Sequence, residues 1–347
     1  MRGPLCVLVV LFHSGMTLPD DIIQVSFSRV LFEVVVPYFF FFSGFLFFIH
    51  CKGQFGVTEY IGKLKKRFHS LLIPYVLWIS IYLLLRSLVL FWSHESFVDY
   101  WNLGGVGDFF KFYWNYKSLI LPYDDWSGCS GYSTVPLLVP LWFLRDLFVV
   151  SLLAPIIFFL IKRFNTILVW LLGIAYLAQV WPIHTGATIS ALFWFVFGAY
   201  FSIKGKDFID VLSRYRVPSY FTSCALFIAE VYYHGVLTPV GYYLHTFFAL
   251  SMFVSIIGLY SRFPAAFVKN EMLVKASFFI YVFHGFLVPY VQNLMVRIFP
   301  SFPSQSYVVA QIQYVMVPLL VIMICILTYL FMAKYTNQLL LVLTGNR

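Results

Sequence analysis

The chain has 347 residues, of which 61% are hydrophobic, 21% are aromatic and only 11% are charged, and its mean hydropathy is +0.87. Soluble domains carry about 25% charged residues, so this composition excludes a water-soluble monomer. The net charge of +9 could indicate nucleic-acid binding, but in a membrane protein the position of the basic residues relative to the spans decides its meaning. The five cysteines are not spaced like metal ligands, so we expect no metal site.

Apolar runs close to the roughly 20 residues that a helix needs to cross a bilayer recur along the chain. We predict an all-α bundle of about ten transmembrane helices, forming one integral membrane domain over 1–347. The expected spans are 3–17, 31–50, 71–92, 135–161, 166–181, 187–203, 218–234, 241–260, 275–297 and 313–334. The first and fifth runs are short for a span, so each could be tilted or re-entrant.

The distribution of Lys and Arg supports this helix count. If the N-terminus is cytoplasmic, most of the 23 basic residues fall on inner connections, as the positive-inside rule requires. The basic residues on outer connections are Arg29, Lys111, Lys117 and Arg297. The pattern predicts that both termini are cytoplasmic, and it explains the positive charge by topology and lipid contact without a nucleic-acid partner.

An extracytoplasmic loop is expected at about 93–134. It carries Glu95, Asp99, Asp108, Asp124 and Asp125 and is rich in Tyr, Trp and Phe. The rings could stack on sugar rings while the carboxylates accept hydrogen bonds from hydroxyl groups. The alternative interpretation is an aromatic belt at the membrane surface.

Titratable side chains at bilayer depth are costly unless they face a cavity or a partner, so each one is a candidate functional residue. These residues are His13, Glu33, Arg86, Arg145, Asp146, Glu230 and His284. Arg86 and Glu230 lie near predicted outer ends, where snorkelling gives them a structural explanation. Glu33 lies within a very apolar helix, and either a structural role or a catalytic role facing a cavity would fit it.

Four of these residues fall in one layer of the predicted bundle. His13, Arg145, Asp146 and His284 each lie roughly eight to twelve residues into a helix, which is about 12–18 Å deep. A neutral imidazole can deprotonate a hydroxyl nucleophile, and a cation can stabilise the developing oxyanion. The layer therefore suits acyl transfer, although it would also suit a proton relay in a transporter. Adjacent residues point about 100° apart on a helix, so Arg145 and Asp146 need not pair.

The run from Arg2 to His13 resembles the Arg-x10-His signature of the acyltransferase-3 family of integral membrane acyltransferases. Four further segments resemble the same family in the same order along the chain. They are FFFFSGFLF at 39–47, KKRFHSLLIPYVLW at 65–78, PLWFLRDLFVVSLLAP at 140–155 and SFFIYVFHGFL at 277–287.

The resemblance implies transfer of an acyl group, commonly acetyl from cytoplasmic acetyl-CoA, to a hydroxyl of a cell-envelope carbohydrate. It implies location in the bacterial inner membrane. His13 takes the place of the family's catalytic histidine, and Arg2 that of the arginine that meets the acyl donor. The helical rise from Arg2 to His13 is about 16 Å, which suits an elongated thioester. Arg145 and His284 match further candidate catalytic positions, and Trp142 and Asp146 are candidate substrate-binding residues.

The family often carries an Arg-x-x-Arg after its second helix. The nearest match begins at Arg67, but Ser70 stands in the position of the second arginine. Lys63 and Lys66 supply positive charge nearby, although without the bidentate geometry of arginine. We expect these three basic residues to bind the phosphates of the donor, whereas the alternative is the positive-inside rule alone.

The sequence thus predicts a membrane O-acyltransferase that uses acyl-CoA, with a polysaccharide, lipopolysaccharide or lipid-linked glycan as acceptor. The rival hypothesis is a transporter or flippase of lipid-linked glycans or small solutes. We see no internal inverted repeat and no paired helices broken by Gly or Pro, which transporters often have. No phosphate loop, HExxH, CxxC or GxSxG motif competes with the membrane residues.

Overall fold

The structure is a computed structural model. It describes residues 2–14, 21–51, 54–101, 104–120, 132–234, 238–267, 271–298 and 307–346. Within these ranges, the side chains of 2–4, 106, 118–120, 132–133 and 266 are not described. Asp124 and Asp125 of the predicted outer loop lie outside the described residues.

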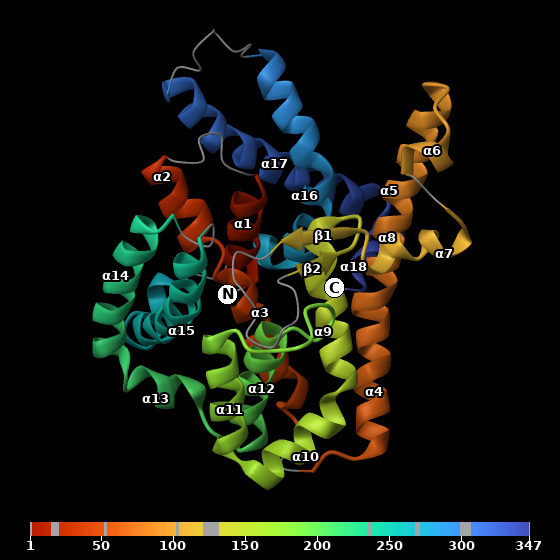
Figure 1. Cartoon of the computed structure of the whole chain (residues 1–347). Helices are drawn as coiled ribbons and strands as arrows, with labels where there is room; N and C mark the ends of the chain where they lie inside the picture. Colours follow the sequence, from red (N-terminus) through yellow and green to blue (C-terminus); the bar gives the residue numbers. More distant parts are fainter. Residues whose placement is uncertain are drawn as a thin grey trace.

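Helices form nearly all of the regular structure in these ranges (Figure 1). In the first half of the chain they are α1 (Arg2–His13), α2 (Ile22–Gln24), the π-helix η1 (Val25–Leu31), α3 (Val35–Phe48), α4 (Val57–Arg67), the π-helix η2 (Phe68–Leu72), α5 (Ile73–Trp92), α6 (Phe97–Trp101), α7 (Val106–Phe109), α8 (Lys111–Trp114), the 3-10 helix η3 (Val139–Leu141), α9 (Trp142–Leu152), α10 (Ala154–Phe164) and α11 (Thr166–Ala178). In the second half they are α12 (Ile189–Ile203), α13 (Phe208–Ser213), α14 (Arg216–Tyr232), α15 (Pro239–Arg262), η5 (Pro264–Ala266), α16 (Glu271–Ile298), α17 (Tyr307–Tyr335) and α18 (Asn337–Thr344).

The predicted all-α class is confirmed, with one small addition. The strands β1 (Lys117–Ile120) and β2 (Tyr132–Val135) pair antiparallel, with Lys117 opposite Val135 and Ile120 opposite Tyr132. They lie in the predicted outer loop, which also contains α6, α7 and α8. These segments are too short to give a periodic hydropathy signal, so the sequence did not indicate them.

Each predicted span contains a helix, but the helices differ in length. Five are long and apolar enough to cross a membrane, namely Ile22–Phe48, Val57–Trp92, Pro239–Arg262, Glu271–Ile298 and Tyr307–Tyr335. A sixth candidate is the pair Val139–Leu152 and Ala154–Phe164, which is bent by 61°. The bend falls at the start of α10, where Pro155 lies in the first turn. Proline has no backbone N–H, so it cannot donate the hydrogen bond that would continue α9.

Other apolar helices are shorter than a full span. α11 and α12 have 13 and 15 residues, α14 has 17, and the described part of α1 has 12. The chain is therefore a helical membrane protein with several spans. The number ten, and the side of the membrane on which each terminus lies, stay predictions.

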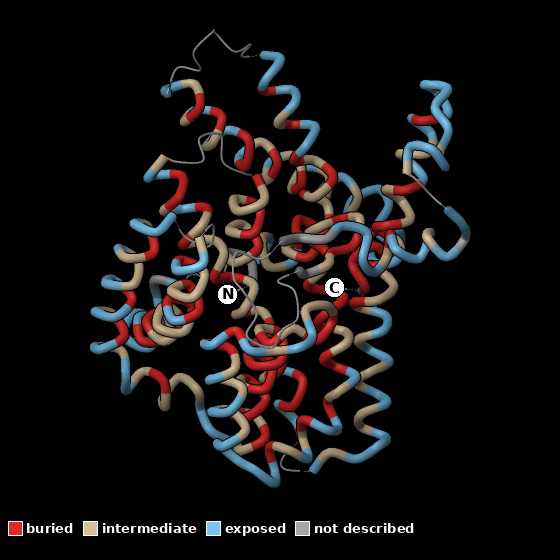
Figure 2. Tube along the Cα trace, in the orientation of Figure 1, coloured by how far each residue is buried: buried red, intermediate tan, exposed pale blue. Residues whose placement is uncertain are grey.

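The tightest helix packing in the core joins α3 to α12. A Cβ atom on Gly44 would lie 2.0 Å from the carbonyl oxygen of Phe195, and one on Gly198 would lie 2.0 Å from that of Phe41. Only glycine permits such a close approach of two helix backbones. This packing explains the glycine of the FFFFSGFLF segment, and it places α12 among the most buried parts of the chain (Figure 2).

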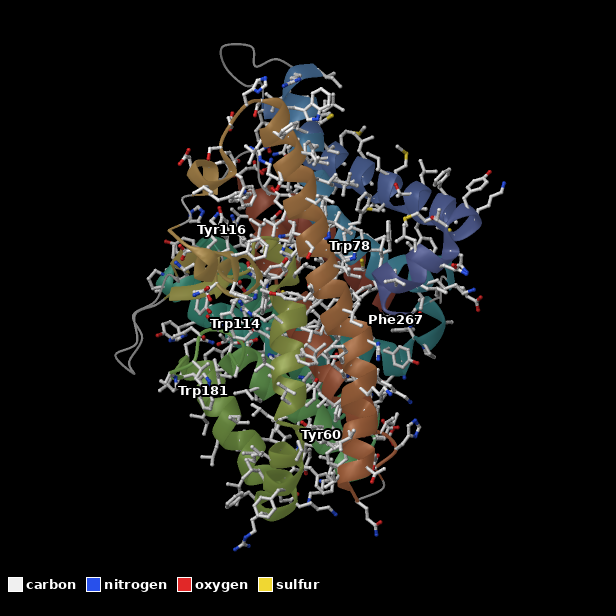
Figure 3. All side chains as sticks on the ribbon, turned by 90° about the vertical axis from the view of Figure 1, so that its right-hand side faces the viewer. Tyr60, Trp78, Trp114, Tyr116, Trp181 and Phe267 are labelled. Carbon is white, nitrogen blue, oxygen red and sulfur yellow. The ribbon has the colours of Figure 1, made fainter. Side chains whose placement is uncertain are left out.

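The long helix formed by α4, η2 and α5 runs along one side of the bundle (Figure 1). Near its start the Tyr60 hydroxyl donates a hydrogen bond to the carbonyl of Leu152, at 3.1 Å. Further along, Trp78 Nε1 donates to the carbonyl of Leu343 on α18, at 3.0 Å, and both aromatic residues are labelled in Figure 3. The α4–α5 helix therefore contacts both the α9–α10 break and the C-terminal helix.

Candidate functional site

Two histidines far apart in the sequence meet inside the bundle. His13 ends α1 and His284 lies in the middle of α16, and their ring centroids are 5.3 Å apart with the planes inclined by 39°. His284 is fully buried, whereas His13 is partly buried. The structure therefore brings together the two imidazoles that the sequence placed in one layer.

Hydrogen bonds on both sides of the histidine pair hold α1 against α16. The Cys6 thiol donates to the carbonyl of Ser277 at 2.9 Å. At the other end of α1, Gln292 Nε2 donates to the carbonyl of Ser14 at 2.6 Å. These bonds fix how far α1 is shifted along α16. That alignment places the two imidazole rings opposite each other.

The hydrogen bonding of His284 determines which ring nitrogen carries the hydrogen. Its Nδ1 lies 3.1 Å from the carbonyl oxygen of Ile280. Because a carbonyl can only accept, Nδ1 must be the donor, and in the neutral ring Nε2 then holds a lone pair. This Nε2 is buried and has no hydrogen-bond partner among the described residues. A buried polar atom left without a partner needs an explanation, such as a catalytic role or a bound water molecule.

Arg145 and Asp146, which need not pair on helix geometry alone, do pair in the structure. Arg145 Nε lies 2.8 Å from Asp146 Oδ1, and the exposed fractions of the two side chains are 3% and 0%. Arg145 also donates to the carbonyl of Trp114 and, at 3.0 Å, to that of Thr134. The guanidinium group lies over the Trp114 ring, 5.3 Å from its centroid.

The same pair contacts a further outer segment. Asp146 Oδ1 accepts from the backbone N–H of Gly186 at 3.1 Å, and the hydroxyls of Thr134 and Thr185 lie 2.6 Å apart. The pair therefore anchors the end of α8, strand β2 and the connection before α12 to the helix α9. Trp114, labelled in Figure 3, belongs to this anchored region.

Trp142, the first residue of α9, lies beside a different group. Its ring centroid is 6.3 Å from that of Phe40 on α3, and the side chain is partly buried. Close to it, the hydroxyl of Tyr281 donates to the carbonyl of Pro140, just before α9. This bond links α16, one turn before His284, to the start of α9.

Glu33 lies in another cluster. It sits in the turn between η1 and α3, and its carboxylate interacts electrostatically with His245, Arg29 and Glu230. His245 Nδ1 on α15 lies 2.5 Å from Glu230 Oε1 on α14. His245 was missed by the sequence analysis, although a histidine early in the predicted span 241–260 was the signal that could have identified it. Glu230, which sequence reasoning explained by snorkelling, is instead fully buried.

The expected donor-binding residues divide into two kinds. Lys63 Nζ donates to the carbonyl of Phe47 at 2.5 Å, and Arg67 Nη2 donates to that of Ser43 at 3.3 Å. Both therefore donate to carbonyls toward the C-terminal end of α3, and that of Phe47 is among the last four, which have no partner within the helix. Lys66 is exposed and makes no hydrogen bond or ion pair with the other residues that the structure describes. Arg2 begins α1, but its side chain lies outside the described part.

The connection before α4 holds a thiol, Cys51, that could in principle accept an acyl group. Its Sγ donates to Glu59 Oε1 at 3.1 Å. Burial, and next this hydrogen bond, raises the pKa of the Cys51 thiol to about 11. A thiol is nucleophilic as the thiolate, so Cys51 at neutral pH is a hydrogen-bond donor rather than an acyl carrier.

An apolar cavity of about 240 Å³ lies beside α1 and α3. Its lining residues are Leu5, Phe39, Phe42, Ser43, Phe45, Leu46 and Phe208. Ser43 connects this cavity to Arg67, which binds its carbonyl oxygen. Leu5 lies about 12 Å along the helix from His13. Among the described residues, no group of three or more His, Cys, Asp or Glu side chains is placed to hold a metal ion.

Comparison with known proteins identifies the family. A family profile described as an acyltransferase domain matches residues 1–333. The succinoglycan biosynthesis protein ExoH of Rhizobium meliloti (strain 1021) is 28% identical over 264 residues, which cover 74% of this chain and 63% of that protein. The chain thus matches less than two thirds of the length of this relative, and no solved structure is significantly similar. With its long apolar helices, the chain is a multi-pass membrane protein that belongs to the acyltransferase-3 family.

Proposed function

We propose that this protein transfers an acyl group from acyl-CoA to a hydroxyl of a cell-envelope or extracellular carbohydrate, and that the acyl group is acetyl. The reaction would take place in the bacterial inner membrane. Membership of the acyltransferase-3 family supports an acyltransferase over a transporter. Similarity to a succinoglycan biosynthesis protein supports a polysaccharide acceptor. The observation that carries the proposal is the apposition of His13 and His284, at 5.3 Å between ring centroids.

In this proposal His13 is the general base. It takes the proton of the acceptor hydroxyl while the oxygen attacks the thioester carbonyl. The new C–O bond of the ester forms and the C–S bond of the thioester breaks. His13 then gives its proton to the departing CoA thiolate, which leaves as the free thiol. His284 Nε2, which lacks a partner among the described residues, accepts a hydrogen bond from the His13 imidazolium and stabilises it as the proton is held.

The donor would approach along α1 from the basic side of the bundle. The apolar cavity beside Ser43 suits the pantetheine arm and the acyl chain. Lys66, which is exposed, would meet the phosphates, together with Arg2 as the family resemblance implies. Lys63 and Arg67 act in this scheme mainly by fixing the end of α3 beside the cavity. The helical rise of about 12 Å from Leu5 to His13 then brings the thioester to the base.

Arg145 and Asp146 would act as positioning residues in this scheme. Their buried pair fixes the loop that contains Trp114 and Thr134 over α9. Trp142, one turn before Arg145, would contact the substrate. The effect of the pair on transfer would then come through the position of this loop.

The test uses the full chain, purified and reconstituted in lipid nanodiscs with acetyl-CoA. We expect free CoA thiol to appear with the wild-type protein, faster when unacylated envelope glycan is added. The His13→Ala and His284→Ala variants should release CoA at least about 100-fold more slowly, the effect expected for loss of a general base. A wild-type protein that releases no CoA under any condition, but moves a lipid-linked glycan between leaflets, would replace the proposal with the transporter hypothesis.

A further inference from the structure

A second group of polar side chains lies apart from the histidine pair, at the junction of η1, α14 and α15, with Glu230 and His245 buried and Arg29 and Glu33 partly buried. It consists of Arg29, Glu33, Glu230 and His245. The Glu230–His245 pair, 2.5 Å apart, joins α14 to α15, while Arg29 and Glu33 come from η1 and the turn that follows it. In Figure 1 this junction lies toward the end of the bundle marked by α2, away from α10 and the start of α4.

The backbone around Glu33 is unusual. η1 is a π-helix over Val25–Leu31, and its pattern continues to Phe32, whose N–H donates to the carbonyl of Phe27 at 2.9 Å. A π-helix is rare and is frequently found at functional sites. The chain then turns at 32–34 before α3 begins. Glu33 therefore lies in a break between two helices, where a side chain can reach the neighbouring helices α14 and α15.

Three atoms of this group are buried and lack hydrogen-bond partners among the described residues. They are Arg29 Nε, Glu33 Oε2 and Glu230 Oε2. Glu230 itself is fully buried. Buried polar atoms are nearly always paired, and leaving one unpaired is costly. The pairing of Glu230 with His245 satisfies one carboxylate oxygen and leaves the other open.

The unpaired atoms define the chemistry of a ligand. Two carboxylate oxygens accept hydrogen bonds, and one guanidinium N–H donates. A complementary ligand therefore offers at least two donors and one acceptor close together, as neighbouring sugar hydroxyls do. A metal ion does not fit, because Arg29 contributes a positive charge and no group suitable for a metal was found in the described ranges.

We propose that Arg29, Glu33, Glu230 and His245 form a binding site for the hydroxyl groups of the acceptor carbohydrate, separate from the histidine pair. This inference rests on the proposed function, because it names the substrate that the site holds. His245 orients the Glu230 carboxylate, and the break at Glu33 lets the carbohydrate reach both carboxylates. The acceptor would then enter between η1 and the α14–α15 hairpin, while the donor uses the opposite, basic end.

The test compares isosteric variants in the full-length protein in nanodiscs, with unacylated envelope glycan from a deletion strain as the probe. Glu33→Gln and Glu230→Gln should each raise the glycan KM at least about tenfold, the loss expected for a hydrogen bond to a charged group. The KM for acetyl-CoA should change less than about threefold. The matched control is Ser223→Ala, which removes a 3.0 Å hydrogen bond to Ser255 between the same two helices.

Binding without turnover separates this inference from the proposed function. His13→Ala protein should still bind the radiolabelled glycan in equilibrium dialysis, and adding Glu33→Gln should weaken that binding at least about tenfold. Equal binding by both proteins, an equal rise in both KM values, or a Ser223→Ala variant that behaves like Glu230→Gln would overturn the site. Absence of CoA release by the wild-type protein would instead count against acyl transfer itself, whatever the dialysis shows.

Discussion

The Arg145–Asp146 pair and the His13–His284 pair both lie inside the bundle, but the Arg145 guanidinium group and the His284 ring differ in how far their hydrogen-bonding atoms are satisfied. Arg145 uses three of its nitrogen atoms, on Asp146 and on the carbonyls of Trp114 and Thr134. His284 uses one nitrogen on its own helix and leaves the other without a partner in the described ranges. The guanidinium group therefore holds three segments together, although Asp146 Oδ2, like His284 Nε2, has no partner among the described residues. We propose a chemical role for the unpartnered imidazole nitrogen alone.

The largest expected effect is on catalysis by the histidine pair. His13→Ala and His284→Ala should lower the rate of acyl transfer by about 10²–10⁴-fold. Protein abundance should stay near the wild-type level for His13→Ala, whose side chain is partly buried. His284→Ala leaves a cavity in the core and should lower the midpoint of thermal unfolding without preventing folding. The measurement is CoA release at matched protein concentration, with size-exclusion chromatography as the control for folding. Parallel loss of activity and of folded protein would make the pair structural.

The opposite result is expected for the partnered pair. Arg145→Met leaves Asp146 buried and unpaired, which should lower the free energy of unfolding by about 3–5 kcal/mol. The double variant Arg145→Met, Asp146→Leu should recover much of that loss, because no charge is then left alone. Denaturant unfolding in detergent measures both. If the single variant keeps its stability but loses transfer, Arg145 contacts the reacting groups rather than positioning a loop.

The cavity beside α1 should respond to added volume. Ser43→Leu places extra carbon atoms inside the apolar lining and should raise the KM for acetyl-CoA about fivefold or more, since overpacking costs about 1–3 kcal/mol. Ser43→Ala is the matched control and should leave the KM near the wild-type value. An unchanged KM for the leucine variant would exclude this cavity as the place of the donor.

The smallest effect separates two lysines of one helix. Lys66 is exposed, so Lys66→Gln should raise the acetyl-CoA KM about two- to threefold, as expected for an exposed ionic contact. High salt should remove the difference. Lys63 instead donates to the carbonyl of Phe47, so Lys63→Gln should lower thermal stability more than Lys66→Gln does. Identical behaviour of the two variants would remove the distinction between donor contact and helix cap.

Much of the helical framework follows from composition and hydropathy, because long apolar runs have few alternatives in a bilayer. The helices over Pro239–Arg262, Glu271–Ile298 and Tyr307–Tyr335 lie close to their predicted ranges. The Arg2-to-His13 spacing and the His284 segment also gave the central pair before its geometry was known. The proximity of the two rings depends on the packing of α1 on α16, which no local pattern encodes.

Other features could not be read from the chain. Glu230 near the end of a predicted span fits snorkelling, and its full burial depends on the partner His245 from the next helix. Whether Lys63 binds phosphate or caps α3 depends on how α4 folds back on that helix. The pairing of Arg145 with Asp146 depends on rotamers and on the three segments that they anchor. Each of these features is a tertiary contact. The sequence around each residue would look the same whether or not that contact formed.

The most direct test of acyl transfer at the histidine pair is mass spectrometry of envelope glycans from deletion cells that carry the wild-type chain or His13→Ala at matched abundance. We predict that the glycan gains the mass of an acetyl group only with the wild-type chain. The total amount of exported glycan should be unchanged. The same increment in both strains would show that His13 is not required. Equal acylation in all strains with reduced glycan export in the deletion would contradict the acyltransferase account.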